Sequence, residues 1–190
     1  MFTLPKKHQT IVLMNSMFCS NIVLIGFMGT GKTAVAKYLS EKYELHMIDM
    51  DQVLSERVGK SIADIFATSG EAYFREQETN LLTELQQQQQ VVISCGGGAA
   101  MAPGNVWKMK EIGSVVLLTA SPETIHQRVQ DDEERPILKG RNTIEFISEL
   151  MEKRRKKYEV AADIVIQTDD KTIPQICEEL IEKVVEISKR

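Results

Sequence analysis

Apolar residues along the chain alternate between short runs typical of buried strands and longer stretches with helical spacing. The run at 21–25 is apolar throughout after its first residue and ends at a glycine, which favours a buried parallel strand. Similar short runs predict strands at 46–49, 91–94, 114–118 and 163–166. Strands that alternate with helices indicate a parallel sheet covered on both faces, so the predicted fold is a three-layer α/β domain.

The segments between these strands carry helical patterns. The last predicted helix, 172–188, has its apolar residues on one face: Ile173, Ile176, Cys177, Leu180, Ile181, Val184 and Val185. Ser121 followed by Pro122 predicts a helix start, because serine caps helices and proline suits the first turn. The charged segment 131–142 contains proline and glycine and is predicted to be a loop. Further helices are predicted at 32–43, 51–58, 61–67, 69–88, 104–111 and 143–159.

The composition narrows the possible classes of protein. The chain has 190 residues, 43% hydrophobic and 26% charged, which is typical of one globular domain. A formal net charge of −4 argues against a nucleic-acid binder, which usually carries a basic surface. No apolar run approaches the ~18 residues that a membrane span needs. We therefore expect a monomer with small-molecule partners, and neither a nucleic acid nor a membrane as partner.

Cysteine usage and the first residues bear on the cellular compartment. Cys19, Cys95 and Cys177 form no CxxC pair, which predicts a reducing compartment, the cytoplasm. The histidines show no metal-ligand spacing, which argues against a zinc site. Residues 1–20 contain a short apolar run after two lysines, but it is shorter than the ~7 residues of a signal-peptide core. We interpret 1–20 as an extension and 21–190 as one domain.

The segment Gly26–Thr33 reads GFMGTGKT and matches the phosphate-binding pattern GxxxxGK[ST]. It follows a predicted strand and precedes a predicted helix, which is the context that this motif requires. Glycines let backbone N–H groups surround an anion, and the helix N-terminus adds a favourable dipole. We expect Lys32 to contact the β- and γ-phosphates and the Thr33 hydroxyl to bind Mg²⁺. A P-loop protein that binds a nucleoside triphosphate is predicted, with GTPase, ATPase motor and small-molecule kinase all open.

Further clusters follow the phosphate-binding motif in a specific order. They are Asp49-Met50-Asp51, Gly59–Phe66, Gly70–Glu78, Gly96–Gly98, Arg135–Leu138 and Lys153-Arg154, which lies four residues before Tyr158. In this order and spacing they resemble shikimate kinase, over about residues 21–188. The resemblance implies a P-loop fold of the nucleoside-monophosphate-kinase type, with strand order 2-3-1-4-5.

The resemblance also implies an activity. It is the ATP-dependent phosphorylation of the shikimate 3-hydroxyl in chorismate and aromatic amino-acid biosynthesis, with Mg²⁺ as cofactor. A shikimate-binding segment at about 50–80 and a lid at about 128–142 are implied as mobile parts. Two alternatives stay open: another kinase of the same fold, such as a gluconate kinase, and a non-catalytic ATP-binding module. The arginine pair and triple glycine disfavour the first, and the complete set of catalytic residues argues against the second.

The resemblance assigns residues to the nucleotide and the metal. The nucleotide-binding residues are Gly29, Thr30, Gly31, Lys32, Thr33, Ala34, Arg128 and Arg135. Arg128 matches a position that stacks on adenine, and Arg135 is expected to move over the transferring phosphoryl group. Asp49 and Ser94 are implied to hold Mg²⁺ through water, beside the direct ligand Thr33.

The remaining candidates belong to the second substrate. The resemblance gives Asp51 a bond to a shikimate hydroxyl, which it orients or deprotonates; a helix N-cap is its structural alternative. Arg75 and Arg154 suit a substrate carboxylate, because guanidinium offers a bidentate fork. By resemblance, Gly97 and Gly98 also bind the substrate, because they let the backbone approach the hydroxyls of the shikimate ring. Glu78 lies one helical turn after Arg75 and is expected to pair with it. Arg154 is preferred to Arg155 for its spacing to Tyr158, and Cys95 is expected to be a packing residue.

Overall fold

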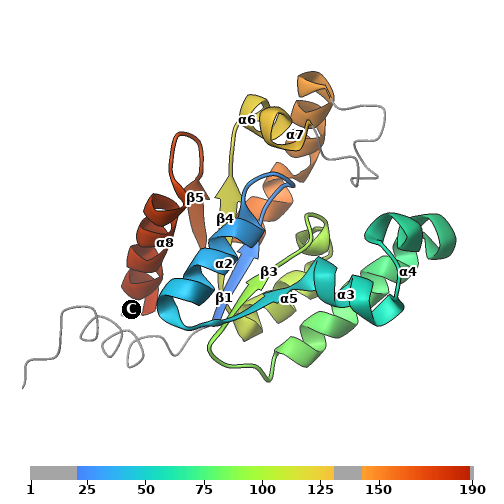
Figure 1. The fold of residues 1–190 in the computed structure, drawn as a ribbon, viewed down its shortest axis with the longest axis horizontal. Helices are drawn as coiled ribbons and strands as arrows, with labels where there is room; N and C mark the ends of the chain where they lie inside the picture. Colours follow the sequence, from blue (N-terminus) through green and yellow to red (C-terminus); the bar gives the residue numbers. More distant parts are fainter. Residues whose placement is uncertain (1–20, 131–142, 189–190) are drawn as a thin grey trace, which may run out of the picture.

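A single parallel sheet organises the part of the chain that the computed structural model describes, residues 21–130 and 143–188. The extension 1–20 and most of the predicted lid, Arg135 included, lie outside the described residues. The sheet has the order β2-β3-β1-β4-β5 (Figure 1). Its strands are β1 (Asn21–Ile25), β2 (His46–Asp49), β3 (Val91–Ser94), β4 (Gly113–Thr119) and β5 (Ile164–Gln167). The predicted fold class and strand order are confirmed.

Helices connect successive strands. They are α2 (Lys32–Tyr43), α3 (Met50–Val58), α4 (Ile62–Leu85), α5 (Pro103–Ile112), α6 (Pro122–Val129), α7 (Ile144–Ala161) and α8 (Ile173–Ser188), with a short 3-10 helix η1 (Ala99–Met101). The separate helices predicted at 61–67 and 69–88 correspond to the two segments of α4, which a kink at Gly70 divides two residues beyond the predicted break. Gly70 has φ 82° and ψ 166°, a non-helical conformation that essentially only glycine adopts, so the helical backbone is interrupted there and the two segments meet at a kink.

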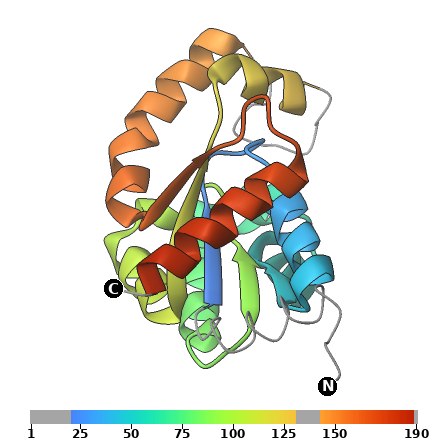
Figure 2. The same cartoon turned by 90° about the vertical axis from the view of Figure 1, so that its left-hand side faces the viewer.

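Side chains from alternate positions of the strands fill the two sides of the sheet. Ile22 and Leu24 pack with α2 and α8, where Leu39 and Leu180 are buried. Val23 and Ile25 point to the opposite face, which α3, α4, α5 and the end of α7 cover. Figure 2 shows α8 crossing the sheet on the viewer's side. Burial on both faces explains why the β1 sequence is a continuous apolar run.

The register of the central strands decides which residues meet at the carboxyl edge of the sheet. Ser94 at the end of β3 is aligned with Leu24 of β1 and with Asp49 at the end of β2. The loop after β1, the start of α3 and the loop after β3 therefore lie side by side. None of the helices in the described ranges is both long and apolar enough to cross a membrane.

Candidate active site

The loop between β1 and α2 has the geometry of an anion cradle. Gly29 and Gly31 have φ angles of 75° and 93°, in the left-handed region that favours glycine. A Cβ at Gly29 would lie 2.8 Å from Cγ1 of Val129, because α6 packs closely on the loop. Gly31 is the N-cap of α2 and supplies no side-chain cap, so the positive end of the helix dipole faces the loop. A phosphate group suits this position.

Two cationic side chains contact this loop. Lys32 is 9% exposed, and its Nζ donates to the carbonyl oxygens of Gly26 and Phe27 at 3.0 and 2.9 Å. Arg128 on α6 donates from Nη1 to the Gly29 carbonyl oxygen at 3.2 Å and to Oγ1 of Thr168 at 3.1 Å. Arg128 thus connects the loop with the segment that follows β5, at the edge of the cradle.

Three oxygen-bearing side chains meet next to the first turn of α2. Oγ1 of Thr33 donates to Oδ2 of Asp49 at 2.8 Å and lies 3.3 Å from Oγ of Ser94. Mg²⁺ prefers oxygen ligands and keeps several waters, and this donor set fits it together with nucleotide phosphates. Within the described ranges, no three His, Cys, Asp or Glu side chains gather as a metal site.

Asp49 also begins the next helix. Its Oδ1 accepts from the backbone N–H groups of Asp51 and Gln52 at 3.1 and 3.3 Å, so Asp49 is the N-cap of α3. The alternative of a helix N-cap at Asp51 is wrong, because Asp51 already lies in the first turn of α3. The cap leaves Oδ2 of Asp49 directed at Thr33.

The loop after β3 brings two carboxylates together. A Cβ built on Gly96 would lie 2.7 Å from Oδ1 of Asp51 and 2.8 Å from Oε1 of Glu78. The two acids come from α3 and α4, and they approach this closely because position 96 has no side chain. Glu78 is 0% exposed.

Arg75 lies against the last glycine of the same loop. Its Nη1 donates to Oε2 of Glu78 at 2.5 Å and its Nη2 to Oε1 of Glu71 at 3.0 Å, so the predicted pairing with Glu78 is confirmed. The Phe74 ring centroid lies 5.4 Å from the guanidinium carbon. A Cβ on Gly98 would come within 2.5 Å of that carbon, so only glycine leaves room for the guanidinium here.

Helix α7 supplies a second arginine to this loop. Nη1 of Arg154 donates to the carbonyl oxygen of Gly97 at 3.3 Å, and the Tyr158 hydroxyl donates to the same oxygen. The Arg154 guanidinium also lies 5.7 Å from the centroid of the Phe27 ring, which belongs to the phosphate-binding loop. Arg154 is therefore placed between the two loops.

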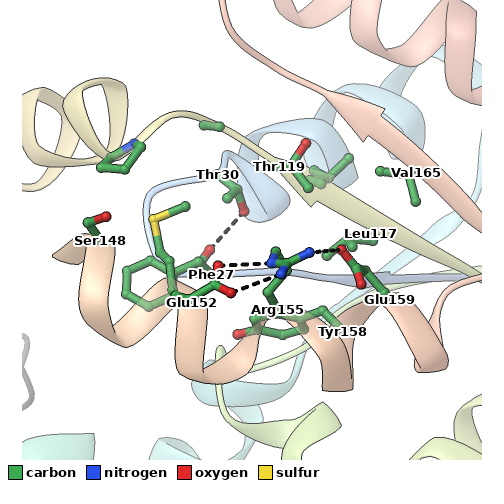
Figure 3. A pocket seen from close by; sticks show the side chains of 14 residues that line it. Phe27, Thr30, Leu117, Thr119, Ser148, Glu152, Arg155, Tyr158, Glu159 and Val165 are labelled. Carbon is green, nitrogen blue, oxygen red and sulfur yellow. Dashed lines mark hydrogen bonds and ion pairs between the residues drawn. The ribbon is translucent and has the colours of Figure 1, made fainter.

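The neighbouring Arg155 points elsewhere. It pairs with Glu152 at 2.9 Å and with Glu159 at 3.2 Å along the helix, as Figure 3 shows. Together with Leu117 it lines a cavity of about 360 Å³ between α7, β4 and the phosphate-binding loop, which contributes Phe27 and Thr30. The structure thus separates the two arginines, with Arg154 at the glycine loop and Arg155 away from it.

Burial changes the ionisation of groups around the glycine loop. Loss of solvent raises the pKa of Glu78 to about 7, while Arg75 lowers it and Asp51 and Glu71 raise it. Burial also raises the pKa of the Cys95 thiol, and it raises the pKa of the Tyr158 hydroxyl. Cys95 is a free, buried thiol, which confirms the expectation of a packing residue.

Some contacts of the site were not foreseen from the sequence. Glu71 accepts from Arg75, Phe27 lies beside Arg154, and Tyr158 shares the Gly97 carbonyl oxygen with Arg154. Of these three residues the sequence indicates only Tyr158, through its spacing from Arg154. Glu71 lies four residues before Arg75 on the same helix, and that spacing was an available signal. The contact of Phe27 with Arg154 joins distant segments and leaves no local pattern.

The parallel sheet and the phosphate-binding loop define a P-loop nucleotide-binding protein with a second, arginine-bordered site beside the loop. The family model described as "Shikimate kinase" matches residues 28–185. A shikimate kinase of Persephonella marina is 43% identical over 164 residues, which are 86% of this chain and 98% of that protein. The chain belongs to the shikimate kinase family.

Solved structures agree with this assignment. The structure of shikimate kinase from Acinetobacter baumannii in complex with shikimate superimposes with a TM-score of 0.87 and 30% identity, covering 93% of this chain and 98% of that one. A gluconokinase from Sinorhizobium meliloti shares the fold, with a TM-score of 0.58 and 18% identity over 90% of this chain and 95% of that one. The second likeness shows a common architecture only.

Proposed function

We propose that this chain transfers the γ-phosphoryl group of ATP to the 3-hydroxyl of shikimate, giving shikimate 3-phosphate and ADP. The observation that carries the proposal is that the guanidinium groups of Arg75 and Arg154 lie against the loop 96–98, next to the phosphate-binding loop. A Cβ on Gly97 would lie 3.5 Å from the backbone nitrogen of Met28, so the two loops are in contact. Two guanidinium groups suit a carboxylate, and membership of the family supports shikimate as its bearer.

The nucleotide would occupy the cradle after β1. Gly29, Thr30, Gly31 and Ala34 would surround the phosphates together with Lys32, which would exchange its carbonyl partners for phosphate oxygens. Arg128, at the edge of the loop, would stack on adenine. Arg135 lies outside the described residues, and its contact with the transferring phosphoryl group rests on the resemblance alone.

Mg²⁺ would be held by Thr33 directly and by Asp49 and Ser94 through water. The fit rests on the oxygen cluster of these three side chains, with contacts of 2.8 and 3.3 Å from Thr33. When bound, the ion would offset the negative charge that develops on the phosphate oxygens.

Asp51 would bind and orient the reacting hydroxyl. It lies two residues beyond Asp49 and against Gly96, close to both the proposed metal ligands and the arginine pair. Phosphoryl transfer passes through a loose transition state, so orientation matters more than strong proton abstraction. Asp51 would accept the hydrogen bond from the hydroxyl and receive its proton as the new bond to phosphorus forms.

The proposal extends to the whole chain. Residues 21–190 would form one catalytic domain after an extension, act as a monomer, and work in the cytoplasm, where ATP is available. The segments at about 50–80 and 128–142 would close over the bound substrates, which would keep water from the phosphoryl group.

A coupled assay of ADP release tests the proposed reaction. The full chain with ATP and Mg²⁺ is offered shikimate, gluconate and other hydroxylated carboxylic acids in turn, and we expect turnover with shikimate alone. Carbon–phosphorus coupling in the NMR spectrum of the product then identifies the phosphorylated position. Turnover with gluconate but not shikimate would favour the other kinase, and no turnover with any acid would favour a non-catalytic module.

A further inference from the structure

Glu78 is unusual among the described residues because half of its carboxylate has no partner. The side chain is 0% exposed, and Oε2 is bound to Nη1 of Arg75 at 2.5 Å. Oε1 has no hydrogen-bond partner. No other buried side-chain oxygen or nitrogen atom in the described ranges lacks one. A buried, unpaired polar atom is costly, so its persistence at a substrate site calls for a functional explanation.

Charged groups from several elements surround Glu78. Arg75 and Glu71 approach from α4, Asp51 from α3, Cys95 from the end of β3 and Tyr158 from α7. Burial raises the pKa of both the thiol and the phenol, so these two groups stay neutral near pH 7. Glu78 therefore faces one cation and two carboxylates in a place without solvent.

We propose that Glu78 takes up a proton when shikimate binds, so that the substrate carboxylate is held more tightly as the pH falls. This inference rests on the proposed function, because it requires the carboxylate of the substrate at Arg75 and Arg154. The bound carboxylate adds a third negative charge around Arg75 and competes with Glu78 for its guanidinium. Like charge makes the ionised form of Glu78 less favourable, so a proton from the buffer binds at its carboxylate.

The geometry gives that proton a place. Oε1 of Glu78 and Oδ1 of Asp51 lie within 2.8 Å of the same point, where a Cβ of residue 96 would be. An O–H group formed at Oε1 is directed into this space and would donate toward Asp51, directly or through one water. Oε1 of Glu78 would then have a hydrogen-bond partner when the substrate is bound.

Arg75 keeps its direction when Glu78 is protonated. Nε and Nη2 still donate to Oε1 of Glu71 at 3.2 and 3.0 Å, and Phe66 and Phe74 lie 5.8 and 5.4 Å from the guanidinium carbon. Protonation therefore removes one negative charge from the site without removing the cation that binds the substrate. Glu78 is in this sense a positioning residue that also adjusts the charge of the site.

The sign of the pH dependence follows from the two states. Burial holds the pKa of Glu78 at about 7 in the free chain, and bound shikimate would raise it further. Affinity for shikimate is then highest below pH 7, falls as the pH rises through both values, and becomes constant above them. If the substrate raises the pKa by about one unit, the Kd increases about tenfold from pH 6 to pH 9.

Titration calorimetry of the full chain with shikimate tests the proposal. Measured at pH 7.5 in phosphate and in Tris, which differ in ionisation enthalpy, the binding heats should report uptake of about half a proton for a one-unit shift. No uptake, or a Kd that stays constant or increases toward low pH, would overturn the inference. Absence of shikimate binding at every pH would instead overturn the proposed function.

Two variants identify the group. Glu78→Gln resembles the protonated form, so its proton uptake should vanish and its Kd at pH 9 should approach the wild-type value at pH 6. Glu71→Gln removes the other acid that contacts Arg75, and it should keep the uptake. Loss of uptake in Glu71→Gln, or its survival in a folded Glu78→Gln, would assign the proton elsewhere. If Glu78→Gln does not fold, the wild-type calorimetry and Glu71→Gln still decide.

Discussion

Two adjacent arginines on α7 have different surroundings, so a substitution of one can serve as the control for a substitution of the other. Arg154 donates to the Gly97 carbonyl oxygen, whereas Arg155 pairs with Glu152 and Glu159 on its own helix. Both Arg75→Ala and Arg154→Ala should lower kcat/KM for shikimate by ~2–5 kcal/mol, because each removes a desolvated partner of the substrate carboxylate. The KM for ATP should change less than about threefold. Steady-state kinetics with each substrate varied in turn gives both values.

Arg155→Ala is the control for that series. Its exposed ion pairs contribute little, so kinetics and stability should stay close to wild type. If Arg155→Ala were damaging and Arg154→Ala silent, the assignment on α7 would be wrong by one residue. If Arg75→Ala and Arg154→Ala both left shikimate kinetics intact, the carboxylate would bind elsewhere.

Substitution of Lys32 is expected to lower the catalytic rate. Its ammonium group lies over the carbonyl oxygens of Gly26 and Phe27, inside the cradle where phosphate would bind. Lys32→Met keeps most of the length of the side chain and removes its charge, so kcat should fall by roughly a hundredfold or more, for ~3 kcal/mol. ADP release measures the rate, and circular dichroism checks that the fold is retained. A variant with more than half of the wild-type kcat would contradict the assignment.

The contacts of the site residues were easier to predict from the sequence than their burial. The spacing to Tyr158 selected Arg154, and the structure brings both side chains to the same carbonyl oxygen. The pairing of Arg75 with Glu78 followed from helical spacing. The complete burial of Glu78 could not be foreseen, because it depends on α3 and the loop after β3, which are distant in the sequence.

At the scale of elements, strands and helices both lie close to their predicted ranges, and α2 has the predicted bounds. The first three strands match the predicted ranges because each is buried on a sheet and bounded by turn residues. The predicted division of α4 is also present, because Gly70 interrupts the helical backbone two residues beyond the predicted break. The 3-10 helix η1 follows three glycines and has no periodic pattern that could announce it.

Asp49 is the N-cap of α3 and also a proposed ligand of Mg²⁺ through water. Asp49 accepts two backbone hydrogen bonds with Oδ1 and faces Thr33 with Oδ2. Asp49→Asn should preserve the cap, because asparagine caps as well as aspartate, and stability should change by less than ~0.5 kcal/mol. The Mg²⁺ concentration for half-maximal rate should rise about tenfold, since a charged group near the ion is lost.

Asp49→Ala separates the two roles. It loses the cap as well, so it should unfold ~1 kcal/mol more easily than Asp49→Asn while showing a similar Mg²⁺ requirement. Denaturant unfolding and magnesium titration of the rate measure the two effects. An unchanged Mg²⁺ requirement in both variants would remove Asp49 from the proposed metal site.

At the scale of the whole molecule, local patterns gave the alternation of strands and helices but not their spatial order. Short buried strands and helical connections imply a parallel sheet with right-handed crossovers, and several strand orders satisfy that rule. The family resemblance implies the order 2-3-1-4-5, and the structure has it. Strand order depends on which pairs of strands are neighbours, and single-sequence periodicity contains no such information.

The first described residue, Asn21, lies at the start of β1 and joins this strand to its neighbours. The buried Asn21 donates from Nδ2 to the carbonyl oxygens of Gln88 and Ile112 at 2.7 and 3.1 Å, and its Oδ1 accepts from the Val91 N–H at 3.2 Å. One side chain thus joins β1 to the segments before β3 and β4, at the edge of the sheet opposite the site. Residues before Asn21 contribute none of the proposed catalytic groups.

Deletion of residues 1–16 should therefore leave kcat unchanged and lower stability little. Asn21→Ala in the shortened chain should cost about 2 kcal/mol, because it leaves buried backbone groups without partners, and it should lower the Tm by roughly 4–8 °C. Thermal unfolding and ADP release on the full chain, the shortened chain and the shortened variant give the comparison. Activity that disappears with residues 1–16 would mean that the extension contributes to the site, and an Asn21→Ala variant as stable as its parent would show that the domain does not depend on this junction.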